Sequence, residues 1–165
     1  MSSGQRLLIV GGIALALWGM GYGLWYAVFA EHQALDGIGA SLATGFSAAA
    51  ERNTTGADAA LLQYRAAKYN YDRQVDVHGH WIALAMLLIV VGIAYDRVEF
   101  SRSVKFAAAL GLLLGSILFP LGVLLETASQ GPIPKGIAVL GSALVIASLA
   151  GITYGFARVP SATRD

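Results

Sequence analysis

The sequence contains no cysteine and little charge. Only 13% of its 165 residues are Asp, Glu, Lys or Arg, about half of the roughly 25% found in soluble domains. The absence of cysteine excludes disulfides, thiolate metal sites, cysteine-ligated iron–sulfur clusters, thiol nucleophiles and a covalently attached c-type haem. A net charge of +1 argues against a nucleic-acid partner. The scarcity of charge points instead to a membrane protein.

Hydrophobic residues make up 56% of the chain and gather in four segments, at about 7–30, 80–95, 106–125 and 136–157. A helix needs about 20 apolar residues to cross a bilayer, so the second segment must tilt or include flanking residues. The first segment is longer than the ~7–15 apolar residues of a signal peptide, and we interpret it as an uncleaved anchor. We therefore predict an all-α integral membrane protein, a single domain over 1–165 built as a four-helix bundle.

The basic residues predict the orientation of this bundle. Six of them fall in segments that lie on one side of the membrane: Arg6, Arg97, Arg102, Lys105, Arg158 and Arg164. The short 127–135 connection on the other side holds only Lys135. Because basic residues concentrate on the cytoplasmic side, we predict cytoplasmic termini and an external 31–79 segment. The corresponding location is a bacterial inner membrane.

The 31–79 segment has a helical pattern of its own. Apolar residues recur at three- and four-residue spacing from Leu35 to Ala49, on one face of a helix. The stretch RNTTGAD interrupts this pattern and offers Asn53 or Thr55 as an N-cap. A second helical pattern begins near residue 57 and meets no proline before the membrane. These patterns predict an external helical hairpin between the first and second spans, with one nearly continuous helix over 57–95.

Small residues line the predicted spans. Three pairs of glycines have the four-residue spacing that lets membrane helices approach closely: Gly19 with Gly23, Gly111 with Gly115, and Gly151 with Gly155. Such faces serve either packing within the bundle or association with other chains. The expected partners are therefore the lipid bilayer, other membrane subunits and a second copy of this chain.

Two of the three histidines stand two residues apart, in the stretch DVHGHWIALAM. Positions two apart on a helix point about 200° away from each other, so we expect His78 and His80 to face different neighbours. His32, at the outer end of the first span, is expected at the same membrane depth. Histidine is a common metal ligand, and these three residues are the candidate ligands of the chain. The alternative interpretation is that they are solvated polar residues at the membrane interface.

Three carboxylates are expected near these histidines. Asp72, Asp76 and His80 are spaced i, i+4, i+8, so a continuous helix stacks two carboxylates above the imidazole of His80. Such a carboxylate holds an imidazole in one tautomer and raises its basicity as a ligand. Glu126 is expected at the same depth, at the outer end of the third span. These carboxylates are candidate supporting residues, and His80 is the favoured ligand because Asp76 precedes it by one turn.

The helix that carries the histidine pair is similar to a helix of a known family. The 20 residues VDVHGHWIALAMLLIVVGIA resemble the helix of haem–copper oxidase subunit I that carries His-x-His, an aromatic residue and an apolar run. In that family the two histidines ligate different haems on opposite faces of the helix. The resemblance implies ligand roles for His78 and His80, with Trp81 in the aromatic position. The chain lacks the further histidines of the family's copper site, so an oxygen-reducing centre is excluded and a smaller site is expected.

Two functions follow from these observations. The first is electron transfer or metal handling at the outer face, with haem b or copper bound by His32, His78 and His80. The second is a non-catalytic accessory subunit of a larger membrane complex, without a cofactor, whose hairpin and glycine faces bind other subunits. A quinone site near the outer aromatic residues is a weaker third option. None of these functions makes the chain an enzyme on its own.

Overall fold

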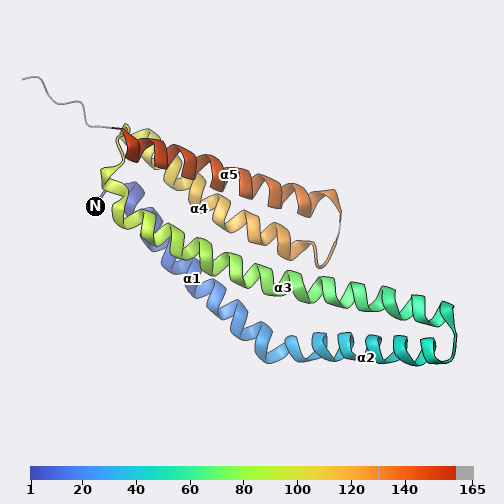
Figure 1. Cartoon of the computed structure of the whole chain (residues 1–165). Coiled ribbons are helices and arrows are strands. Elements are labelled where there is room, and N and C mark those ends of the chain that lie inside the picture. Colours follow the sequence, from blue (N-terminus) through green and yellow to red (C-terminus); the bar gives the residue numbers. More distant parts are fainter. Residues whose placement is uncertain (130, 159–165) are drawn as a thin grey trace, which may run out of the picture.

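The computed structural model describes residues 1–129 and 131–158, and this part of the chain is all-helical. Its elements, in chain order, are α1 (Ser3–Phe29), α2 (Glu31–Ala50), α3 (Thr54–Ala94), the short 3₁₀ helix η1 (Tyr95–Arg97), α4 (Arg102–Leu125) and α5 (Pro132–Ala157). The predicted all-α fold is thereby confirmed for the described residues. Figure 1 shows these helices as one elongated bundle with a projecting hairpin.

Four of the helices are long and apolar enough to cross a membrane, namely α1, α3, α4 and α5. They correspond to the four predicted spans, although α1, α4 and α5 begin about four residues earlier than expected. Because α4 and α5 begin early, their first turns include polar or charged residues such as Arg102 and Lys135. Such residues are accommodated in the first turn of a membrane helix, where it meets water. Four candidate membrane helices are thus a property of the fold as well as of the composition.

Helix α3 runs unbroken for 41 residues, which at ~1.5 Å per residue is about 60 Å, twice the ~30 Å of a hydrocarbon core. Its two halves differ in composition. Residues 54–76 contain six charged side chains, and residues 77–94 contain none. The prediction of one continuous helix over 57–95 is confirmed as far as Ala94. The charged half of α3 and helix α2 project together beyond the ends of α4 and α5 (Figure 1).

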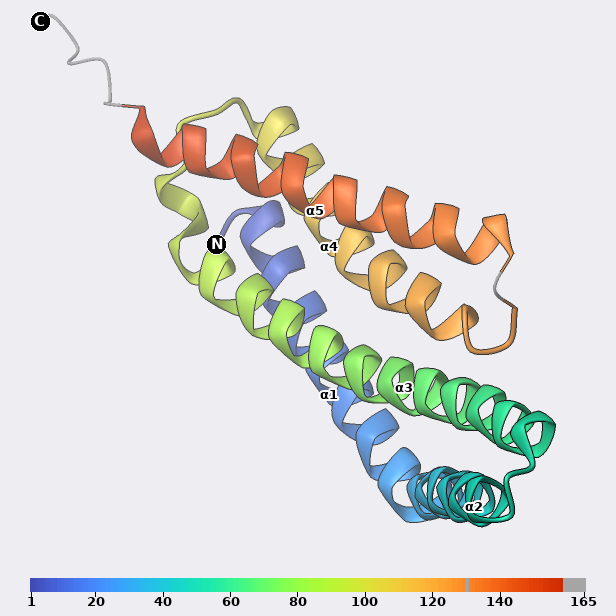
Figure 2. The same cartoon turned by 45° about the vertical axis from the view of Figure 1, so that its right-hand side comes forward.

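The helices pack as two antiparallel pairs joined along α3. Helix α1 packs on the apolar half of α3, α4 packs on α5, and α4 also contacts α3 and α1. Figure 2 shows α4 and α5 side by side along the α1–α3 pair. The core between the pairs contains the buried residues Leu8, Trp81, Leu88, Ala109 and Leu112. Helix α5 is held mainly by α4.

Two of the three predicted glycine pairs lie at helix contacts within the chain. Gly19 and Gly23 face α3, whereas Gly111 and Gly115 face α5. At Gly115 an added Cβ would come within 2.7 Å of the Gly141 carbonyl oxygen, so the backbones of α4 and α5 touch. Gly151, by contrast, has open space around the position of a Cβ. Close approach of the helices therefore depends on glycine at these contacts.

Helix α2 packs on α3 through small residues. Ser41 and Ala48 are its buried positions, and an added Cβ on Gly45 would lie 3.5 Å from the Cβ of Ala60 on α3. The turn between the helices ends at Asn53, whose side chain accepts a hydrogen bond from the Gly56 amide at 2.9 Å, so the predicted N-cap is confirmed. Because small side chains face α3, the larger apolar side chains of α2 point elsewhere.

Candidate functional site

The projecting hairpin meets the four-helix bundle near residues 69–81 of α3, and most of the predicted site residues lie around this junction. His78 and His80 are on α3 itself, Glu126 follows the last residue of α4, and His32 is in the first turn of α2. Each side chain is positioned by the helix that carries it. Their partners therefore depend on which neighbouring helix each one faces.

His78 faces α1. Its Nδ1 lies 2.9 Å from the carbonyl oxygen of Gly19, and since a carbonyl only accepts hydrogen bonds, Nδ1 donates. The neutral ring then carries its lone pair on Nε2. The imidazole also lies directly on Gly23, where a Cβ would overlap the ring. The absence of a side chain at Gly23 thus provides the notch in α1 that receives this imidazole.

His80 faces the opposite side, toward α4. Its ring centroid is 4.8 Å from that of Phe119, with the planes inclined by 46°. The prediction that the two histidines serve different neighbours is therefore confirmed. No hydrogen bond joins Asp76 to His80 among the described residues. Asp76 lies instead 3.7 Å from Arg73 in an ion pair, and Asp72 pairs with Lys68 at 2.7 Å.

Glu126 is buried, with 8% of its surface exposed, and its partners are on the hairpin. Tyr69 donates a hydrogen bond to its Oε2 at 2.8 Å, and the Nε of Arg73 lies 3.6 Å from the same oxygen. The Arg73 guanidinium also lies 5.1 Å from the centre of the Tyr69 ring. A hydrogen bond with Tyr69 and the nearby carboxylates raise the pKa of Arg73, so this guanidinium remains charged beside Glu126.

This contact between Glu126, Tyr69 and Arg73 fastens the end of α4 to the charged half of α3. Sequence reasoning placed Glu126 near the histidines and missed its true partners. A signal was present, because Tyr69 and Arg73 are four residues apart and share one helix face. Which element that face meets is decided by the packing of α4 on α3.

Aromatic residues surround the α1 side of the junction. Trp81 is 2% exposed and meets Trp18 and Tyr22 edge-on, at ring centroid distances of 5.9 and 5.2 Å. A shallow hollow of about 340 Å³ lies beside them, lined by Leu17, Trp18, Gly21, Tyr22 and Trp25. The hollow is mostly apolar and suits a hydrocarbon or ring surface. It lies close to the depth at which the sequence predicts the outer interface.

The candidate histidine ligands do not converge in this arrangement. His32 is exposed, His78 is bound to α1 and His80 rests on Phe119. Among the described residues no group of three or more His, Cys, Asp or Glu side chains is placed to hold a metal. A porphyrin does not fit between α1 and α3 at His78, because the His78 imidazole already touches the α1 backbone at Gly23.

No protein-family model, curated protein or solved structure matches the chain, so its own residues and their geometry are the basis for assigning a function.

The fit of His78 into α1 makes Gly23 sensitive to substitution. We expect Gly23→Ala to destabilise the protein by ~1–3 kcal/mol, because the new methyl group overlaps the imidazole and the two helices must separate. Gly21→Ala is the matched control on the same helix, since a Cβ there meets no atom within 4 Å. Thermal unfolding in detergent, followed by circular dichroism, measures both variants. Equal midpoints for the two variants would contradict the described packing of His78.

Proposed function

We propose that this chain is a non-catalytic membrane subunit that binds another membrane protein through the outer face of α2. The observation that carries the proposal is an exposed apolar row on that helix, formed by Leu35, Leu42 and Phe46 and called the α2 stripe below. These side chains are 45%, 41% and 73% exposed. Their spacing of seven and four residues places them on one face of the helix.

The α2 stripe belongs to a part of the chain that a membrane core does not cover. Helix α2 packs on the charged half of α3. The six charged residues of that half exclude it from the hydrocarbon core of a membrane. Moving one apolar side chain of this size from water into a buried contact is favourable by about 1.5–3 kcal/mol. A contiguous exposed row outside the lipid is therefore typical of a protein interaction surface.

The hairpin presents the α2 stripe on a rigid support. Small residues seat α2 closely on α3, and α3 continues without a break into the membrane half. The contact of Glu126 with Tyr69 and Arg73 adds a brace from α4. Binding to a pre-ordered surface loses little conformational entropy. The hairpin thus has the properties of a docking arm in a larger membrane complex.

The test removes the α2 stripe and leaves the hairpin intact. In membranes of the native host, extracted with mild detergent, the wild-type chain is expected to migrate in a complex that contains a different polypeptide. Leu42→Ser with Phe46→Ser should release the chain from that complex, with an affinity loss of ~2 kcal/mol or more. The control is Leu61→Ser with Leu62→Ser, which makes the same kind of change at exposed positions of α3.

Native gel electrophoresis followed by mass spectrometry of the band gives the readout. A wild-type chain that migrates alone, or only with copies of itself, would contradict the accessory-subunit function. Equal release by the stripe variant and the α3 control would show that α2 is not the binding face.

We also propose that the hairpin lies outside the cell membrane, with the α3–α4 connection in the cytoplasm. Basic residues concentrate at the end of the bundle that includes Arg97, Arg102 and Lys105. Because the chain has no cysteine, single cysteines at the exposed positions Ala43 and Ser101 report the topology cleanly. An impermeant thiol reagent should label Ala43→Cys in intact cells and Ser101→Cys only after permeabilisation. The reverse pattern would invert the topology.

A copper ion ligated by His78 is the second function that we propose, because the haem b that the sequence also led us to expect does not fit beside α1 at this residue. The specific observation is the hydrogen bond from His78 Nδ1 to the Gly19 carbonyl, since a backbone acceptor of this kind orients ligating imidazoles and leaves Nε2 as the ligand nitrogen. This favours His78 over His80, whose expected partner Asp76 contacts Arg73. Copper is favoured over haem because it needs less space beside α1.

Metal analysis and a visible spectrum of protein from a haem- and copper-replete host test this second function. Bound copper is expected, lost in His78→Ala and retained in His80→Ala. The ligand hypothesis would be contradicted if the wild-type protein contains neither copper nor haem and the alanine variants assemble normally. That result leaves the accessory-subunit function in place.

A further inference from the structure

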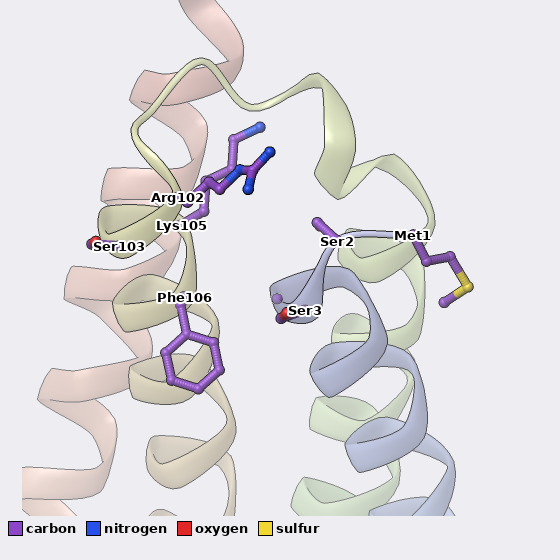
Figure 3. A pocket seen from close by; sticks show the side chains of 8 residues that line it. Met1, Ser2, Ser3, Arg102, Ser103, Lys105 and Phe106 are labelled. Atoms are coloured by element: carbon purple, nitrogen blue, oxygen red, sulfur yellow. The ribbon is translucent and has the colours of Figure 1, made fainter.

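A cavity lies at the end of the bundle opposite the hairpin, between the beginnings of α1 and α4. Its volume is about 740 Å³, and its walls include Ser2, Ser3 and Gly4 on one side and Arg102, Lys105 and Phe106 on the other. Figure 3 shows the Arg102 and Lys105 side chains close together on α4, extending toward the space that separates α4 from the start of α1. The cavity is distinct from the junction with the hairpin.

The lining of this cavity is cationic and offers hydrogen-bond donors. Among the residues that the structure describes, it contains Arg102 and Lys105 and no carboxylate. Lys105 Nζ donates one hydrogen bond to the Asp96 carbonyl oxygen at 3.2 Å, which leaves two of its three donors for a ligand. The hydroxyl group of Ser3 adds a neutral donor. Asp96 and Glu99 lie in the same α3–α4 connection but do not line the cavity.

The position of the cavity joins this cationic lining to an apolar surface. Arg102 and Lys105 begin a helix whose remaining residues, to Leu125, include no charged side chain. Phe106, 45% exposed, directly follows Lys105 and lies one turn after Arg102, on the side of the two cations that faces the apolar part of α4. A ligand that fills this space therefore meets positive charge and a hydroxyl donor at the water side and an aromatic ring at the lipid side.

We propose that this cavity binds the phosphate group of an anionic phospholipid in the leaflet at this end of the bundle. A guanidinium and an ammonium that converge on one space match the charge and the oxygen geometry of a phosphodiester. Basic pockets between membrane helices on the cytoplasmic side are typical sites for anionic headgroups. The acyl chains extend past Phe106 along α1 and α4, which is the feature that distinguishes a lipid from free phosphate.

The lipid also has a structural consequence at this end. It fills the space between α1 and α4, which belong to different antiparallel pairs, and its single negative charge reduces the repulsion between the two cations there. Occupancy is therefore expected to strengthen the contact between the pairs. This effect does not depend on the hairpin or on its proposed partner.

The experiment uses the full-length protein in a neutral detergent, titrated with phosphatidylglycerol or phosphatidylcholine of the same acyl chains. Native mass spectrometry counts the bound lipids, and thermal unfolding measures stabilisation. We expect phosphatidylglycerol to bind with a defined stoichiometry and to raise the unfolding temperature more than phosphatidylcholine does. Arg102→Gln with Lys105→Gln should weaken phosphatidylglycerol binding about thirtyfold, as expected from removing two basic groups beside one phosphate.

The matched control is Arg6→Gln with Arg97→Gln. It removes the same charge from exposed positions at the same end of the bundle, outside the cavity lining. Equal weakening by the two double variants would overturn the proposal in favour of a diffuse basic surface. Inorganic phosphate that competes with phosphatidylglycerol at equal concentration would overturn the lipid assignment. Retention of the tight-binding lipid by the control, and its loss from the cavity variant, would support the site.

Discussion

The rest of the structure depends on the continuity of α3, because this one helix is both a candidate membrane-spanning element and the support of the hairpin. Its apolar half packs against α1 and α4, and α2 packs along its charged half. A break near Gly79 would separate the two parts. A single glycine in a helix costs only about 1 kcal/mol, and the packing of Val77 and Trp81 on either side of it outweighs that cost.

Glycine-mediated contact is the second constraint, and it determines where polar groups find partners. Because α1 presents Gly19 and Gly23 to α3, the imidazole of His78 reaches a backbone carbonyl that a larger residue would cover. Small residues have the complementary effect in the hairpin. With Ser41, Gly45 and Ala48 turned toward α3, the bulky side chains of α2 remain at the surface.

The two ends of the molecule offer different chemistry to their surroundings. The hairpin end carries the exposed apolar α2 stripe, and the opposite end carries a cavity lined by Arg102 and Lys105. Between them, the Glu126 contact with Tyr69 and Arg73 ties α4 to the hairpin. The two proposed binding surfaces therefore lie at opposite ends of one connected helical bundle.

The sequence by itself determined the helices. Hydrophobic runs, the absence of proline between residue 57 and the second span, and a capping residue at Asn53 or Thr55 are local features from which helices can be predicted directly. It also determined that His78 and His80 diverge, because helix geometry alone sets their directions. Only the tertiary structure decided which partner each residue meets. Glu126 contacts Arg73, Asp76 does not contact His80, and Leu42 and Phe46 point away from α3. These outcomes depend on how each helix is rotated and shifted along its neighbour. The periodicity of residues along a single helix gives no information about that arrangement.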